Sequence, residues 1–505
     1  MVHRGQGQHH RSPTQRTTEP GGRKKKPSPL LNQWETLWEV AADQCCPNDS
    51  CRERFHAHLL AQLVCPGRHT LTSLITTGGR QFHDWTADYS LYAKKRVDPG
   101  VLFSLVRCEI EAMNSPSQPL VVAIDDTILR KTGRKIPGTA YRKDPLGPPF
   151  NLNLIWAQRM IQYSAAVPSP DGDVRMVPIA FQNASTPRKP KRTASDKAFD
   201  EYRDKMKQRN LNTLAVEKLC SLQNERTQSG TAKAPPLHVV VDGSYTNRRM
   251  LKELPPETIL IGRIRKDAHL NFKPDNQKLH GRKRIYGTDA PTPEELRKDE
   301  SIPWIKIKAS ACGKQRTFRV KTLAPLRWKA AGEMDLRLIV IAPVMYMINT
   351  NGKRLYRQPA YLLCTDPSLP LKQILQEYIW RWDIEVNHRD EKTILGVGQA
   401  QVRNINSVES VPAAAVAAYA MLHIAAMKAY GWNSKPDSIP PAKWRNSKKK
   451  NRASTQDLIN ELRRELWSDS INPQHLTDFL NRNTSDTKSL KSVTDMCSAI
   501  LGSTA

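Results

Sequence analysis

Acidic residues follow two short apolar runs that have the character of buried strands. Asp126 comes just after the run 119–124, and Asp242 directly follows the run 237–241. A strand core rejects unpaired charge, and carboxylates that lie close together repel one another. A divalent cation would relieve this conflict, and Mg²⁺ prefers carboxylate, water and phosphate oxygens as ligands. If the two strands are neighbours, Asp126 and Asp242 fit a metal site.

A third acidic residue, Glu385, lies on a strong helical pattern that runs from Pro370 to Leu395 and stops at Gly396. At 100° per residue, the side chains nearest to Glu385 around this helix are basic or aromatic: Tyr378, Arg381, Arg389 and Lys392. The acids at positions 383, 390 and 391 point elsewhere. Glu385 is therefore the lone acid in a basic stripe, although a salt-bridged surface helix would also carry mixed charges.

Composition indicates a large folded protein with a polyanionic partner. The 505 residues suggest about three structural units, and 39% hydrophobic residues suffice for folded domains. The 78 Lys and Arg residues against 49 Asp and Glu residues give a net charge of +29, which points to nucleic acid. No stretch of 18 apolar residues lacks a polar interruption, and the N-terminus has no apolar signal core, so we expect neither membrane insertion nor secretion.

The cysteine pattern favours a reducing, cytosolic compartment. Nine cysteines in the chain are few, odd in number and scattered. The densest group, over 45–69, also holds three histidines, but it contains no paired CxxC spacing. We interpret these cysteines as buried residues of a helical domain rather than as zinc ligands.

The order of predicted elements suggests an α/β core interrupted by a β-rich insertion. Strand patterns occur near 119–124, 151–163, 175–182, 237–241 and 257–262, with a charged helix over 195–225. Period-two patterns at 305–308 and 317–322 predict strands in the insertion. The apolar run 411–427 predicts a buried packing helix, and further helices are expected at 455–468 and 472–482. The predicted segments are 1–29 (disordered basic arm), 30–117 (helical), 118–265 (first part of the core), 266–370 (insertion), 371–400 (the Glu385 helix) and 401–505 (helical).

The spacing Tyr378-x2-Arg381-x3-Glu385-x6-Lys392 resembles the YREK signature of bacterial insertion-sequence transposases of the DDE superfamily. This group contains insertion-sequence family four and relatives such as family seven hundred and one. The resemblance covers roughly 119–400, and the segment 84–89 also looks like the N-terminal region of these enzymes. By contrast, no GxxxxGK[ST], HExxH or GxSxG motif occurs, so an ATPase, a zinc protease or a serine hydrolase lacks its minimum parts.

The resemblance implies a ribonuclease H-like catalytic core with a β-rich insertion, plus helical N- and C-terminal domains, the former binding DNA. It makes Asp126, Asp242 and Glu385 the catalytic and metal-binding triad. The doublet at 125–126 leaves Asp125 as an alternative first carboxylate. The DNA-binding residues that we expect on the Glu385 helix are Tyr378, Arg381, Arg389 and Lys392.

A transposase of this type would bind the terminal inverted repeats of its element, cut the DNA and join the ends to target DNA. The resemblance implies two Mg²⁺ ions, for which Mn²⁺ can substitute, a homodimer on double-stranded DNA and a hairpin intermediate. We expect a cytoplasmic, nucleoid-associated protein that does not bind membranes. The competing hypothesis is a catalytically inactive DNA-binding remnant or repressor, which explains the charge but leaves the ordered acids unexplained.

Overall fold

The structure is a computed structural model, which describes residues 28–144, 147, 150, 152–228, 235–274, 283–349, 352–439, 452–468 and 494–502. Two predicted features fall outside these residues, namely the basic arm predicted over 1–29, except for its last two residues, and the helix over 472–482.

The region before the first strand is helical, as the sequence predicts. It contains α1 (Pro29–Cys45), α2 (Asp49–Val64), α3 (Leu71–Thr77), α4 (Thr86–Ala93) and α5 (Pro99–Met113). Asn48, Thr70 and Asp98 accept hydrogen bonds from backbone N–H groups in the first turns of α2, α3 and α5, which satisfies donors that the helix leaves unpaired. The apolar faces of these helices share one hydrophobic cluster with the sheet, so packing ties the helical region to the core.

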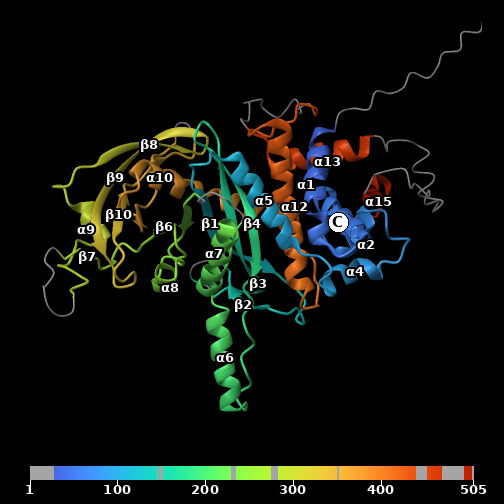
Figure 1. The fold of residues 1–505 in the computed structure, drawn as a ribbon, viewed down its shortest axis with the longest axis horizontal. Coiled ribbons are helices and arrows are strands. Elements are labelled where there is room, and N and C mark those ends of the chain that lie inside the picture. Colours follow the sequence, from blue (N-terminus) through green and yellow to red (C-terminus); the bar gives the residue numbers. More distant parts are fainter. Residues whose placement is uncertain are drawn as a thin grey trace, which may run out of the picture.

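A single large sheet forms the centre of the molecule (Figure 1). Its first strands are β1 (Leu120–Arg130), β2 (Ala140–Lys143), β3 (Leu154–Pro168), β4 (Val174–Asn183), β5 (Leu237–Val241) and β6 (Thr258–Arg263). β3 is antiparallel to both of its neighbours β1 and β4, whereas β5 and β6 run parallel to β1. The sequence pattern predicted that the first strand ends at residue 124. In the structure β1 continues through both aspartates, because it pairs with β3 as far as Arg130.

The strands of the predicted insertion extend this sheet. They are β7 (Asn271–Phe272), β8 (Ile305–Ala311), β9 (Lys314–Arg327), β10 (Leu336–Ile341) and β13 (Ala360–Cys364), and α9 (Pro293–Lys298) lies among them. β13 pairs with both β6 and β10, which gives the order β2-β3-β1-β5-β6-β13-β10-β9-β7. A separate ribbon, β11 (Met345–Tyr346) with β12 (Leu355–Tyr356), connects β10 to β13 along the chain. The insertion is therefore β-rich, as expected, and is hydrogen-bonded to the core.

Two helices that the sequence predicts as continuous are each interrupted. The charged stretch forms α6 (Asp196–Gln208) and α7 (Leu211–Gln228), separated at residues 209–210. α7 packs into the core, whereas α6 has no buried residue and extends away from the sheet (Figure 1). The Glu385 helix forms α10 (Leu371–Trp380) and α11 (Asp383–Thr393), with a tight turn at residues 381–382. A short helix, α8 (Arg248–Lys252), follows the Asp242 turn.

The predicted packing helix lies within α12 (Ser407–Tyr430), which packs against α1, α2, α5 and β4. Although α12 is long and apolar enough to cross a membrane, 94% of its most apolar window is buried inside the protein. That burial agrees with the interpretation as a packing helix. The C-terminal region adds α13 (Thr455–Trp467) and α15 (Met496–Leu501), and α13 confirms the helix expected at 455–468.

Gly262 of β6 is the glycine whose surroundings bear most directly on the Asp242 turn. A Cβ added at Gly262 would lie 2.1 Å from Oγ1 of Thr246 and 3.0 Å from Cγ2 of Val241. Thr246 donates a hydrogen bond of 3.0 Å to the backbone carbonyl of Asp242. We therefore predict that Gly262→Ala displaces Thr246 and destabilises the protein by about 1–3 kcal/mol, measured as a lower midpoint in urea unfolding.

Gly243→Ala is the matched control, because its added Cβ would meet nothing closer than 3.6 Å. Equal destabilisation by the two substitutions would contradict the assignment of strain to the Thr246 contact.

Candidate active site

The central strands bring two of the sequence-predicted acids to neighbouring positions. β5 is completely buried because it lies between β1 and β6, and it pairs with β1 in parallel register, Ile124 opposite Val241. The next residues along the two strands are Asp125 and Asp242. Ser244 fixes the Asp242 carboxylate by donating to Oδ1 from its backbone N–H (2.9 Å) and its hydroxyl (2.7 Å). Two carboxylates therefore lie side by side where β5 ends.

The two aspartates of the doublet face opposite sides of the sheet, as successive residues of a strand must. Val121 and Ala123 belong to the hydrophobic cluster beneath α10, so Asp125 shares their face. Val122 and Ile124 belong to the cluster on the other side, and Asp126 shares that face. Strand alternation thus directs Asp125, rather than Asp126, toward the helix that carries Glu385.

The carboxylate of Asp126 is fully engaged by protein donors. Arg159 donates to its Oδ2 from Nε (2.6 Å) and to its Oδ1 from Nη2 (3.0 Å). The hydroxyl of Tyr245 lies 3.4 Å from the same Oδ1. Arg159 comes from β3, where it pairs with Ile128, and nothing in the sequence shows that its side chain reaches Asp126.

Asp125 is in a different electrostatic situation. Burial raises the pKa of its carboxyl group, and the charge of Asp242 raises it further, while His388, Arg381 and the backbone N–H of Asp126 lower it. The net shift is upward, so the charged form is disfavoured relative to a solvated aspartate. The burial of Asp125 therefore outweighs the positive charge around it.

Arg381 lies between two of the candidate carboxylates. Its Nη1 is 3.3 Å from Oδ2 of Asp125, and its Nη2 is 3.9 Å from Oε1 of Glu385. The Arg381 side chain is 11% exposed, whereas that of Glu385 is 44% exposed. The tight turn between α10 and α11 puts Arg381 at the joint, beside the ring of Tyr378 at 5.9 Å. The guanidinium supplies positive charge next to both carboxylates.

The two other basic residues of the predicted stripe are exposed. Arg389 forms an ion pair with the adjacent Asp390, at 2.9 Å. Partial desolvation lowers the pKa of Lys392, while Glu391, Asp125 and Asp126 raise it, which places Lys392 near the carboxylates even though its side chain remains exposed. The structure thus brings Arg381 and Lys392 near Asp125, with Tyr378 and Glu385 beside Arg381.

Two further residues of the same helix are buried: His388, which the sequence did not single out, and Glu391, which helical spacing directs away from Glu385. Their side chains are 3.5 Å apart, from Nδ1 to Oε2, and among the described residues neither ring nitrogen of His388 has a hydrogen-bond partner. His388 also lowers the pKa of Asp125. Its position three residues after Glu385 is a signal that helical spacing could have revealed.

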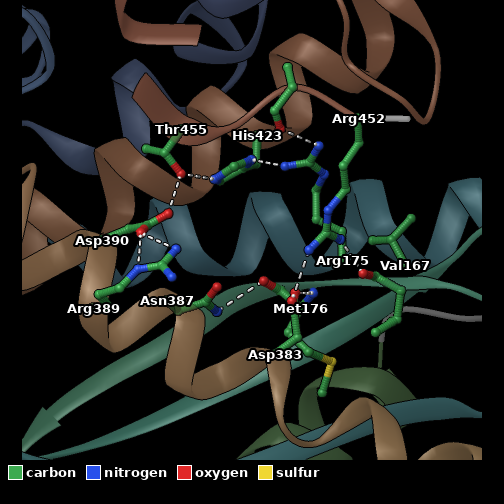
Figure 2. A network of polar contacts seen from close by, with 12 residues as sticks. Val167, Arg175, Met176, Asp383, Asn387, Arg389, Asp390, His423, Arg452 and Thr455 are labelled. Atoms are coloured by element: carbon green, nitrogen blue, oxygen red, sulfur yellow. Dashed lines mark hydrogen bonds and ion pairs between the residues drawn. The ribbon is translucent and has the colours of Figure 1, made fainter. Parts of the chain in front are cut away.

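Polar contacts clamp α11 onto β4 and α13 (Figure 2). Asp383 accepts hydrogen bonds from the backbone N–H of Met176 (2.9 Å) and from Nη2 of Arg452 (3.1 Å). Asn387 donates to the backbone carbonyl of Met176 (2.9 Å). Thr455 donates to Oδ2 of Asp390 (2.7 Å). The acids on the far side of the helix from Glu385 therefore hold it in place.

A buried arginine and histidine extend this network (Figure 2). Burial lowers the pKa of His423 well below its usual value, and nearby Arg175 lowers it further, so the ring is neutral. Nη1 of Arg175 can then donate to Nδ1 of His423 at 3.1 Å, while Nε2 faces the Thr455 hydroxyl at 3.5 Å. The chain of contacts ends at Asp390, which connects α12 and β4 to the Glu385 helix.

The donor set at this site fits a divalent cation in its chemistry. Asp125 and Asp242 supply carboxylate oxygens from adjacent strands, and burial, together with the nearby charge of Asp242, raises the pKa of Asp125. Within the described ranges, no three His, Cys, Asp or Glu side chains are already arranged around one point as metal ligands. Arg381 occupies the space between Asp125 and Glu385 instead.

The cysteine-rich segment packs into the helical region. Cys45, Cys46, Cys51 and Cys65 are buried free thiols. Burial raises the pKa values of Cys45 and Cys46 to about 12, so both are protonated at neutral pH. Asp88, in the segment 84–89, is buried against His58 at 3.1 Å and attaches α4 to α2. These residues serve packing.

The mixed sheet thus presents paired carboxylates beside a helix that bears a third one. The model of the DDE superfamily endonuclease family matches residues 43–324, more than half of the chain. The chain therefore belongs to this family of nucleases. The matched region contains Asp125, Asp126 and Asp242 and ends before the Glu385 helix. A search of curated proteins found no match to this chain.

The burial of Asp125 gives a stability prediction. Because the folded-state pKa of Asp125 lies above its usual value, charged Asp125 destabilises the protein at neutral pH, and the penalty disappears as pH falls toward 3.8. We predict that Asp125→Asn raises Tm at pH 7 and that the difference from the wild type narrows on acidification. A lower Tm for Asp125→Asn at pH 7 would mean that the contact with Arg381 outweighs the cost of burial.

Asp126→Asn is the matched comparison and should act in the opposite direction. It weakens two hydrogen bonds from Arg159 and leaves that guanidinium without its anion. We expect a loss of about 1–3 kcal/mol at pH 7, measured by urea unfolding.

Proposed function

We propose that this protein is a transposase that binds the terminal inverted repeats of its element, cuts the DNA there and joins the ends to target DNA. The observation that carries the proposal is the pair of neighbouring carboxylates, Asp125 and Asp242, beside the helix that bears Glu385. Membership of the DDE superfamily endonuclease family supports the nuclease chemistry. The strand order β4-β3-β1-β5-β6 supports a ribonuclease H-like core.

We propose Asp125, Asp242 and Glu385 as the catalytic carboxylates. Asp125 faces the Glu385 helix, while the oxygens of Asp126 are held by Arg159 and Tyr245 on the other side of the sheet. This favours the alternative first carboxylate over Asp126. Mg²⁺, or Mn²⁺ in its place, would be held by these three residues as a pair of ions that activates water or a 3′-hydroxyl and stabilises the leaving oxygen.

The protein's own residues would prepare the site for DNA. Arg381 neutralises Asp125 and Glu385 in the absence of DNA, and its guanidinium is suited to a bidentate contact with a phosphate. Lys392 and Tyr378 lie close enough to support the same phosphate, and the clamp on α11 keeps all of them in one orientation. The YREK spacing supports a relationship to insertion-sequence family four and its relatives, and with it a hairpin intermediate.

The net charge of +29 supports double-stranded DNA as the partner. A homodimer and a cytoplasmic, nucleoid-associated location complete the proposal, since two element ends must be cut together. The second candidate is an inactive remnant that only binds DNA. The retained carboxylate pair favours the enzyme, because a binding protein gains nothing from repelling acids beside phosphate.

Substitution of the carboxylates tests the proposal. Glu385→Gln and Asp125→Asn should abolish cutting of a DNA end in Mg²⁺, because each removes a negatively charged metal ligand. Their affinity for the same DNA should stay equal or rise, since one charge that repels phosphate is gone. Gel assays of nicking and of mobility measure the two properties separately.

Two controls make this test specific. Asp126→Asn should retain cutting at temperatures at which it is folded, and Glu409→Gln, an exposed position at the start of α12, should be unaffected. Wild-type cutting by Asp125→Asn together with loss of cutting by Asp126→Asn would reverse our assignment of the first carboxylate.

Metal binding can be measured without activity. Mn²⁺ should raise the Tm of the wild-type protein, because a ligand that binds only the folded state stabilises it, and the increase should be smaller in Asp125→Asn. Cutting should require Mg²⁺ or Mn²⁺ and stop in excess chelator. Full cutting in chelator would exclude the metal mechanism.

A further inference from the structure

A basic cleft of about 1400 Å³ lies on the Asp242 side of the site. Gly243, the residue after Asp242, forms part of its wall. Two of its cations are neutralised locally, since Arg265 pairs with Asp267 and Arg297 pairs with Glu294. Four others have no carboxylate within ion-pair distance among the described residues, namely Arg248, Arg263, Lys266 and Lys329.

A second cleft, of about 1250 Å³, borders Arg381, which contacts Asp125, and the face of α11 that bears Asp383 and Asp390. Its walls come from α10 and α11 on one side and from the strands of the insertion on the other, and they include Arg381. Arg316 and Arg357 add exposed positive charge, and neither has a carboxylate partner in the described part of the chain. Two exposed aromatic side chains, Tyr346 and Trp382, line the same cleft as these cations. Cations interleaved with aromatic rings are suited to a nucleic-acid strand.

Arg263 is common to the walls of both clefts. It is the last residue of β6, and its side chain is exposed. Because Gly262 pairs with Val241, Arg263 is the residue of β6 next to Asp242. β13 fixes its backbone from the other side, where Arg263 pairs with Leu362. The sheet thus holds one unpaired cation beside the carboxylates, at the junction of two basic clefts.

We propose that one DNA duplex passes from the first cleft to the second across the carboxylates, with Arg263 contacting a phosphate next to the one that reacts. This proposal rests on the proposed function, because it treats the carboxylates as the reaction centre. The acids repel the DNA backbone locally, and unpaired cations on both sides offset that repulsion. Arg263 is a positioning residue in this arrangement.

Cysteine protection tests the path directly. Cys312 is exposed in the wall of the second cleft, and Cys108 is exposed on α5, which lines neither cleft. Lys329→Cys, in the full-length chain, introduces a thiol at an exposed position of the first cleft. A 30-bp duplex of arbitrary sequence at low salt should slow maleimide labelling of Cys312 and of the new thiol at position 329, and leave Cys108 unchanged.

The variant Arg263→Ala should weaken the protection at both positions in parallel. We expect a Kd roughly tenfold higher, the cost of one charge-assisted contact, and a salt dependence that is about one unit shallower in log Kd against log salt. The matched control is Arg249→Ala, whose guanidinium pairs with Glu253 and lines neither cleft.

Protection of one cleft alone, or of neither, would overturn the continuous path. Equal effects of Arg249→Ala and Arg263→Ala would overturn the role of Arg263. If both clefts are protected but no metal-dependent cutting occurs, the nuclease proposal fails while the DNA path stands.

Discussion

The burial of Asp125 beside a second carboxylate, Asp242, is the constraint around which this site is organised. Parallel pairing of β1 with β5 brings the two carboxylates to adjacent positions, and burial then raises the pKa of Asp125. A folded protein tolerates such a pair only if positive charge is at hand. Arg381 provides it here, from the joint between two helices. The site is thus stabilised by a side chain that can exchange one anion for another, a carboxylate for a phosphate.

Rigid support of the third carboxylate comes from β4 and α13. The Glu385 helix is short and is interrupted at Arg381, so its own hydrogen bonds define its direction poorly. Contacts of Asp383, Asn387 and Asp390 with β4 and α13 supply that direction instead. Residues that contribute nothing to the charge of the site therefore decide where Glu385 lies.

Much of this arrangement could be predicted from the sequence. Apolar runs revealed β1, β5 and β6, and helical spacing selected Glu385 within its basic stripe. Two features could not be derived in this way. The doublet at 125–126 gave no indication of which aspartate faces the helix, because that depends on where β1 pairs with its neighbours and on Arg159 from β3. The turn at residues 381–382 was also missed, since the residues on both sides of it favour helix and φ/ψ at the turn remain in the helical region.

The pairing of β13 with β6 determines what loss of the insertion would expose. A strand that ended the core sheet at β6 would present a row of unpaired N–H and C=O groups, a template for association with other chains. β13 pairs with the groups of that row. β10 and β9 then extend the sheet beyond β13, so that its free edge lies farther from the carboxylates. The inserted strands thus act as an edge protector as well as a wall of the clefts. Excising them would leave an adhesive edge beside Arg263, so loss of the insertion would be penalised by aggregation before any effect on catalysis could be selected.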